Sequence, residues 1–153
     1  MASPQLVKGR QHQPGAFYVA TTVVQNRQPL LVSNIAAKKV IEQFQQVESE
    51  GLLQSIAWVV MPDHVHWLFR LGTPSLGTCM QRFKSRSARE INRRLERARG
   101  PIWQPGYYDH RLRDQGDLHA QARYILANPI RRGLSSQIGE YPYAWSRWGS
   151  DSF

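Results

Sequence analysis

Two histidines separated by one residue, His64 and His66, are side chains whose type and spacing suit metal chemistry. They open the segment HVHWLFRL over residues 64–71, whose β-branched and aromatic residues predict a β-strand. Successive side chains of a strand point to opposite faces, so both imidazoles lie on one face and can bind one divalent ion. Such pairs also occur without a metal, and the preceding Asp63 suits either a ligand or a turn-capping residue.

A tyrosine on a predicted helix could supply a nucleophile next to such an ion. The helix is predicted over Leu118 to Asn128, with Asp117 as its cap and Pro129 ending or kinking it. At 100° per residue, Tyr124 and Asn128 lie about 40° apart, on the side opposite the apolar residues. A lone helical tyrosine is more often a surface or packing residue. The amide one turn along the same polar face, in a basic chain with His-x-His, shifts the interpretation of Tyr124 towards function.

The charge of the chain points to nucleic acid. Twenty Lys and Arg residues against eleven Asp and Glu give a net charge of +9, and sixteen of the twenty cations are arginines. The planar guanidinium pairs bidentately with phosphate and stacks on bases, so this bias favours nucleic-acid binding, although a GC-rich genome also produces it.

Two-thirds of the excess charge lies in one predicted amphipathic helix over residues 77–99. Its apolar stripe includes Met80, Phe83 and Ile91, and its outer face is almost entirely positive. We expect this helix to hold a phosphate backbone beside the metal and the tyrosine. The predicted phosphate contacts are Arg82, Lys84, Arg86, Arg89, Arg93 and Arg94 on this helix, with Arg123 and Arg131 near the tyrosine.

The remaining segments predict an α+β fold. Strands are predicted over residues 17–24, 52–60, 64–71 and, at an edge, 102–113, with a first helix from Ser33 to about Glu50. The resulting fold class is an antiparallel sheet with helices packed on one face, plus a C-terminal helix that carries Tyr124. Residues 1–15 are predicted to form an N-terminal arm, and the aromatic tail 135–153 to pack back on the domain.

Composition excludes several classes of protein. The 153 residues suit one domain, and no apolar run is long enough to cross a bilayer. The lone Cys79 excludes an intramolecular disulfide and a multi-cysteine zinc site. No secretory segment is recognisable at the N-terminus, so we expect a cytoplasmic protein with no membrane partner.

Several motifs occur together in a fixed order. MPDHVHWLF over residues 61–69 is followed by Trp103-Gln104, by Tyr107-Tyr-Asp-His110, and by YILANP over residues 124–129. In these motifs and their spacing, residues 16–148 resemble the single-tyrosine HUH (IS200-like) transposases, and among them the REP-associated tyrosine transposases of bacteria.

This resemblance implies a site and an activity. A ferredoxin-like or RRM-like HUH catalytic domain would span residues 16–134. His64, His66 and Asn128 would bind one Mg²⁺ or Mn²⁺, and Tyr124 would attack DNA to form a 5′-phosphotyrosine. The activity would be single-stranded DNA cleavage and strand transfer at hairpins such as repetitive extragenic palindromes, in the bacterial cytoplasm and associated with the nucleoid, by a monomer or a homodimer.

Some assignments stay open at this point. Gln121 or Asp63 could replace Asn128 as the third ligand, because a neutral amide is a weak one. No dedicated base for the tyrosine is evident, although His110 and His119 could serve, and Tyr107 and Tyr108 are rival nucleophiles. The alternative function is a non-catalytic regulator that binds DNA or RNA hairpins. A histidine-motif nucleotide hydrolase would require a histidine where this chain has Leu68.

Overall fold

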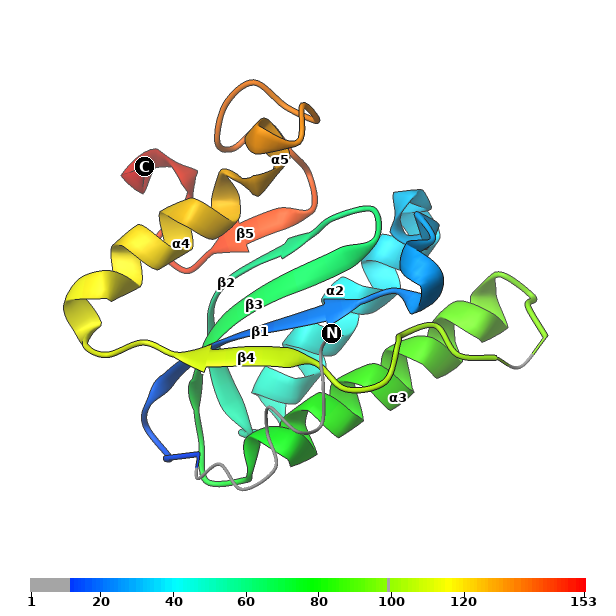
Figure 1. Ribbon diagram of the computed structural model, residues 1–153, viewed down its shortest axis with the longest axis horizontal. Helices are drawn as coiled ribbons and strands as arrows, with labels where there is room; N and C mark the ends of the chain where they lie inside the picture. The colour runs from blue at the N-terminus through cyan, green and yellow to red at the C-terminus, as the bar shows by residue number, and fades with distance from the viewer. Residues whose placement is uncertain (1–11, 99) are drawn as a thin grey trace.

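The computed structural model describes residues 12–98 and 100–153. One antiparallel sheet, whose strands differ in length, lies at the centre of the molecule (Figure 1). The sheet has five strands in the order β4-β1-β3-β2-β5, and each neighbouring pair is antiparallel. The strands are β1 (Phe17–Val23), β2 (Leu53–Val60), β3 (His64–Leu71), β4 (Tyr108–Arg111) and β5 (Ala144–Ser146).

Strands β2 and β3 form the predicted hairpin at the middle of the sheet. The corner between them is tight, with the Met61 amide donating to the His64 carbonyl at 2.8 Å. Along β3 the side chains alternate as predicted, so Val65, Trp67 and Phe69 are buried on one face. The two histidines therefore lie on the other face.

Two long helices cover the face that carries Trp67. The helix α2 (Asn34–Ser49) begins as predicted, since the Ser33 hydroxyl accepts a hydrogen bond from the Ala36 amide at 3.2 Å. The helix α3 (Leu76–Arg94) lies beside it. Phe44 of α2 stacks on Phe83 of α3 with ring centroids 5.0 Å apart, and both contact Trp67. These aromatic rings form the main core.

The helix α3 ends earlier than the charge pattern predicts. Glu96 adopts a left-handed backbone with φ of 52°, the Arg97 amide donates to the Asn92 carbonyl at 2.9 Å, and the Glu96 amide donates to the Arg93 carbonyl at 3.3 Å. This pair of bonds is the Schellman termination, which more often places glycine at the left-handed position. A glutamate there gives no sequence signal for a helix end, and the end of the predicted helix at residue 99 lies outside the described residues.

The tyrosine helix packs on the opposite face of the sheet. Ala122 and Ile125 of α4 (Leu118–Leu126) join a second apolar cluster that includes Val19, Ala57 and Leu68. After a break at Ala127 the chain continues as α5 (Asn128–Arg131), with Pro129 in its first turn. The sheet is thus covered on both faces and separates α2 and α3 from α4 (Figure 1).

Of two local predictions for this segment, the Asp117 cap is wrong and the interruption at Pro129 is confirmed. The Asp117 side chain makes no capping hydrogen bond, because a 3₁₀ turn over Gln115–Asp117 leads directly into α4. Pro129 interrupts the predicted helix but also starts the next one, since its missing amide is tolerated in a first turn. The other short 3₁₀ turns are Gln25–Arg27, Leu30–Val32 and Ser150–Ser152.

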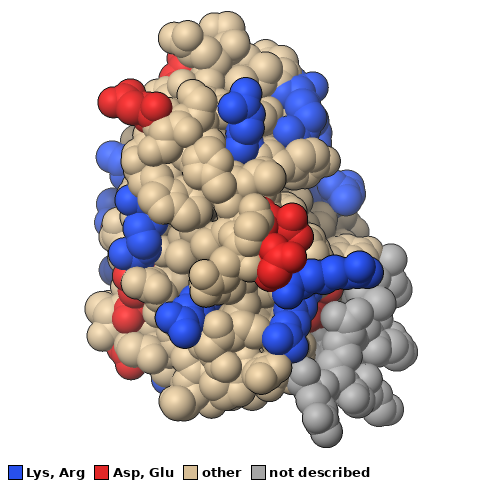
Figure 2. Space-filling model, turned by 90° about the vertical axis from the view of Figure 1, so that its left-hand side faces the viewer, with Lys and Arg blue, Asp and Glu red and all other residues tan. Residues whose placement is uncertain are grey.

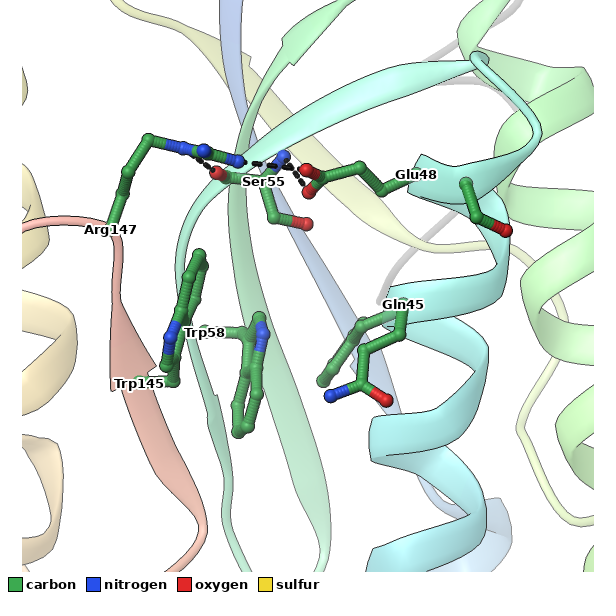
Figure 3. A pocket seen from close by; sticks show the side chains of 8 residues that line it. Gln45, Glu48, Ser55, Trp58, Trp145 and Arg147 are labelled. Carbon is green, nitrogen blue, oxygen red and sulfur yellow. Dashed lines mark hydrogen bonds and ion pairs between the residues drawn. The ribbon is translucent and has the colours of Figure 1, made fainter.

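The aromatic tail packs on the body, as predicted, and adds strand β5. The Tyr141 hydroxyl donates to the Val60 carbonyl at 2.7 Å. Arg147 then donates to the Ser55 carbonyl and pairs with Glu48 of α2, both at 2.8 Å (Figure 3). Beside this ion pair, Trp145 stacks on Trp58 and borders a groove of about 350 Å³ between β5 and α2.

Two further properties bear on the class of protein. Across residues 12–98 and 100–153, no helix is both long and apolar enough to cross a membrane. Cys79 is buried, and burial raises the pKa of its thiol to about 11. The thiol is therefore protonated near neutral pH and has the properties of a core residue.

Candidate functional site

The two histidines lie next to each other at the start of β3, on the face that α4 covers. Pairing with β1 sets Thr21 opposite His66 and Val23 opposite His64. The two imidazole rings are 4.7 Å apart between centroids and nearly perpendicular, at 77°. The predicted presentation of both imidazoles on one face of a strand is confirmed.

Each imidazole has a partner on its Nδ1 atom. His64 Nδ1 lies 2.7 Å from Asp63 Oδ1, and His66 Nδ1 lies 2.8 Å from Thr21 Oγ1. A bond on Nδ1 fixes the orientation of a histidine ring and leaves Nε2 free to coordinate, as in most protein metal sites. The Nε2 atoms of both histidines are therefore available to coordinate a metal ion.

The charge states of these rings suit the same role. Burial lowers the pKa of His66 to about 3, with smaller electrostatic contributions from the neighbouring His64 and Arg131. Burial also lowers the pKa of His64, although the neighbouring Asp63 opposes this shift. Both rings are then neutral at pH 7, which keeps their lone pairs available to a cation.

Asp63 orients His64. Partial burial raises the pKa of this carboxyl group, but hydrogen bonds and positive charge from His64 and Arg27 outweigh it and lower the pKa overall. Its other oxygen accepts from Arg27 Nη1 at 3.3 Å. Both oxygens thus have partners, and Asp63 does not line the cleft described next.

A cleft of about 320 Å³ brings the histidines together with the tyrosine helix. Tyr124 is 60% exposed at its mouth, whereas Asn128 is 7% exposed. Tyr124 and Asn128 both line the cleft, but they do not lie on one helix as predicted, because α4 ends at Leu126 and Asn128 begins α5. Gln121 is not part of the lining. The lining residues are Thr21, Val23, Arg27, His64, His66, Tyr108, Tyr124, Asn128, Arg131 and Arg132.

The donor set of this cleft decides which metal ligands are available. Within the described parts of the chain, no three His, Cys, Asp or Glu side chains gather where a metal could bind. The Asn128 amide oxygen lines the same cleft as the two histidines and is available there as a third protein ligand. Oxygen atoms of water or phosphate would complete the shell, as a hard divalent ion prefers.

Tyr124 has one close cationic neighbour. The Arg131 guanidinium lies over the phenol ring, 3.8 Å from its centroid. Arg131 Nη2 also donates to the Tyr124 carbonyl at 2.9 Å. Arg131 was predicted as a phosphate contact, and the structure adds a contact with the tyrosine itself.

The other candidate nucleophiles and bases lie in different parts of the fold, and one of them lines the cleft. Tyr108 of β4 lines the cleft, whereas Tyr107 is buried with the main core. His119 stacks on Phe153 at 4.5 Å and bonds the Ser152 carbonyl, so it belongs to the packing of the tail. His110 is exposed on the edge strand and does not line the cleft.

The expected position of the basic helix is wrong. Because α3 packs on the Trp67 face, its cations are not beside the histidines and Tyr124. Several are also neutralised within the protein: Arg86 pairs with Glu50 at 2.8 Å, and Arg93 pairs with Glu90 at 2.6 Å. Arg82 lies 4.0 Å from the same Glu50 carboxylate, while Arg89, Arg94 and Arg123 are exposed.

The cations that line the cleft do not belong to α3. Arg27 follows β1 and Arg132 follows α5, and neither was singled out from the sequence. Arg132 could have been found as the neighbour of Arg131, whereas only the pairing of strands brings Arg27 close. On the face shown in Figure 2, basic and acidic side chains are interspersed on a largely uncharged surface, so the excess charge does not gather there.

Lys84 has a role within the fold. Its ammonium group donates to the carbonyls of Gln104 and Gly106 at 2.9 and 2.6 Å, and burial lowers its pKa to about 8. The Lys84 ammonium, predicted as a phosphate contact, is thus held by backbone carbonyls within the fold. It fixes the segment that leads into Tyr108 and the cleft.

Replacing Lys84 with methionine is expected to destabilise the protein by roughly 1–3 kcal/mol, because two carbonyls lose a charged donor. Urea unfolding followed by circular dichroism measures the change. Arg89→Met on the same helix is the control and should change stability by less than about 0.5 kcal/mol, since that side chain is exposed. Equal midpoints for the two variants would contradict the role of Lys84.

The depressed pKa of His66 predicts acid sensitivity of the fold. The group titrates near 6.5 when unperturbed and near 3 in the folded chain, so between these values the unfolded state binds more protons. Stability should therefore fall as the pH drops, by about 2 kcal/mol between pH 7 and pH 5 from this residue. Urea unfolding in EDTA at both pH values tests this, and His66→Gln should show a smaller difference; an unchanged difference would refute it.

Comparison with known proteins gives a consistent result. The family described as "Transposase IS200 like" matches residues 15–128. A REP-associated tyrosine transposase of Escherichia coli is 33% identical over 90 residues, covering 58% of this chain and 51% of the relative. The chain thus spans about half the length of that relative. A Haemophilus influenzae protein named "Putative REP-associated tyrosine transposase" is 25% identical over 145 residues, covering 88% and 82% of the two chains.

A solved structure shows the same fold. It is a REP-associated tyrosine transposase bound to a REP hairpin, and it superposes with a TM-score of 0.71 over 88% of this chain and 79% of its own. At 22% sequence identity this likeness establishes the α+β fold alone. The family match, in contrast, spans both histidines, Tyr124 and Asn128, and extends over well more than half of the sequence, so the chain belongs to the IS200-like transposase family.

Proposed function

We propose that this chain is a metal-dependent endonuclease and strand transferase that acts on single-stranded DNA at hairpins. The observation that carries the proposal is the cleft, which His64 and His66 of β3, Tyr124 of α4 and Asn128 of α5 line together. Family membership supports a transposase, and the hairpin bound to the structural relative supports the kind of DNA.

In this proposal His64 and His66 present Nε2 atoms, and Asn128 presents its amide oxygen, to one Mg²⁺ or Mn²⁺. Such an ion, when bound, withdraws electron density from a phosphate oxygen and so makes the phosphorus more electrophilic. The partners Asp63 and Thr21 hold the two rings in the coordinating orientation before any ion arrives.

Tyr124 is the nucleophile of the proposed reaction. Its Oη–H bond breaks, an Oη–P bond forms, and the bond from phosphorus to the 3′ oxygen breaks. The products are a 5′-phosphotyrosine and a free 3′-OH, with the phenolic proton leaving to water and the 3′ oxygen gaining one. Because one phosphodiester replaces another, the reverse step with a second 3′-OH needs no nucleotide hydrolysis.

The cationic side chains that line the cleft favour the binding of a DNA phosphate next to Tyr124. Arg27, Arg131 and Arg132 all line it, and none of the lining residues is a carboxylate. A site with two neutral imidazoles, an amide and three guanidinium groups attracts a phosphodiester and a divalent ion together.

A direct assay tests the proposal. The protein is incubated with Mn²⁺ and an end-labelled single-stranded hairpin oligonucleotide carrying flanking sequence, and the products are run on a denaturing gel. A labelled protein band and a shortened oligonucleotide are expected, and both should disappear with EDTA. Hairpin binding without adduct or cut product would instead support the non-catalytic regulator.

A further inference from the structure

We propose that Arg131 is a positioning residue for Tyr124, which holds the phenol ring at the cleft and places a positive charge against the phenolate that forms during attack. The proposal deepens the proposed function and rests on it, because it assigns a partner to the proposed nucleophile. A positive charge beside the phenol also explains how Tyr124 could react although the sequence offers no dedicated base to remove its proton.

Two separate contacts join the residues. The guanidinium lies 3.8 Å from the centroid of the Tyr124 ring, and its Nη2 donates to the Tyr124 carbonyl at 2.9 Å. One contact fixes the ring and the other fixes the guanidinium to the same residue's backbone. Tyr124 is 60% exposed, so few other side chains restrict its ring. Arg131 therefore supplies an orientation that core packing does not.

The local sequence explains why Arg131 reaches back seven residues. Pro129 has no amide hydrogen, so the helix of Tyr124 ends at Leu126 and a new one begins at Asn128. Carbonyls in the last turn of a helix lack intrahelical donors and accept side-chain donors instead. The break frees the Tyr124 carbonyl and turns Arg131 towards it.

The chemistry around Tyr124 requires a positive charge. Among the described residues that line the cleft, the only imidazole or carboxylate groups are those of His64 and His66, and both are assigned to the metal. His119, an earlier candidate, packs against Phe153 instead. The phenolic proton must then leave to water, and a guanidinium on the ring face lowers the energy of the negative charge that remains on the ring and its oxygen.

Arg131 can hold Tyr124 and contact DNA together. A guanidinium has five N–H donors in a fixed plane, and one of them is used on the Tyr124 carbonyl. The remaining donors can reach a phosphate in the cleft that Arg131 lines. Binding of substrate therefore does not require the ring contact to break.

The contact itself can be tested without metal or DNA. A guanidinium stacked on an aromatic ring places its Hδ protons in the shielding region, so the Arg131 Hδ resonances should lie upfield of those of exposed arginines. Tyr124→Phe keeps the ring and should keep the shift, whereas Tyr124→Leu should abolish it. Unshifted Arg131 resonances in the wild-type protein would overturn the proposal whether or not the protein cleaves DNA.

The catalytic consequence is measured by single-turnover adduct formation in Mn²⁺ over a range of hairpin concentrations. Arg131→Gln should lower the rate at saturating DNA by about tenfold, and Arg131→Lys should restore part of it. Arg132→Gln removes the same charge from the same cleft without touching Tyr124, so it should mainly raise the DNA concentration for half-maximal rate.

A wild-type rate for Arg131→Gln at saturating DNA, or the same pattern for both arginine variants, would overturn the positioning role. Absence of any adduct with the wild-type protein would instead refute the proposed function. The resonance shift would still report the contact in that case, so the two failures are distinguishable.

Discussion

Tyr124→Phe is expected to abolish the covalent protein–DNA band while hairpin binding persists. Phenylalanine keeps the ring that contacts Arg131 but lacks the oxygen that would attack phosphorus. Removal of a covalent nucleophile lowers rates by roughly 10⁴-fold or more, since the phenylalanine ring has no atom that can bond to phosphorus. The measurement is the amount of labelled adduct on a denaturing gel, alongside a hairpin-binding titration.

The substitution should leave the fold intact. Tyr124 is 60% exposed, and its phenol oxygen lies outside both apolar clusters. Unchanged thermal unfolding would therefore show that the loss is chemical. An adduct that survives in Tyr124→Phe would contradict the assignment.

Tyr108 supplies the matched control for this experiment, because it is the other tyrosine that lines the cleft. Tyr108→Phe should still form the adduct. Its position on β4, within the sheet, suits stacking against a base better than in-line attack. A reversed pattern, with the adduct lost only in Tyr108→Phe, would identify Tyr108 as the nucleophile.

His64→Ala is expected to lose cleavage, by roughly 100-fold or more, and to retain hairpin binding. The variant removes one of the two Nε2 atoms available to a cation in this cleft. It leaves the guanidinium groups of Arg27, Arg131 and Arg132, which we propose attract the phosphate. Cleavage rate and hairpin affinity are measured on the same preparation, together with Mn²⁺ binding by electron paramagnetic resonance.

Asp63→Asn tests the same site through the residue that orients His64. The amide keeps the size of Asp63 but weakens the bond that orients His64, so Mn²⁺ affinity should fall by about 10- to 100-fold, less than in His64→Ala.

Equal losses of hairpin binding and cleavage in His64→Ala would indicate that the histidine is structural. That result would remove the metal from the proposal.

Much of the fold could be predicted because its elements carry local signals. Alternation along residues 64–71 placed His64 and His66 on one face, and the Ser33 hydroxyl and Gly51 marked the limits of the first long helix. The end of α3 could not be predicted, since a glutamate occupies the left-handed position where glycine is the usual signal.

The sequence by itself determined that two imidazoles two residues apart on a strand share a face. It also predicted Tyr124 and Asn128 on one helix, whereas the chain breaks at Ala127 and carries them on two successive helices. Only the tertiary structure decided which of these faces meet. Helical periodicity shows that α3 is basic on its outer side, but not which side of the sheet it covers. Strand pairing and helix docking bring Thr21 and Arg27 to the histidines and leave α3 on the opposite face, because those contacts join residues far apart in the chain.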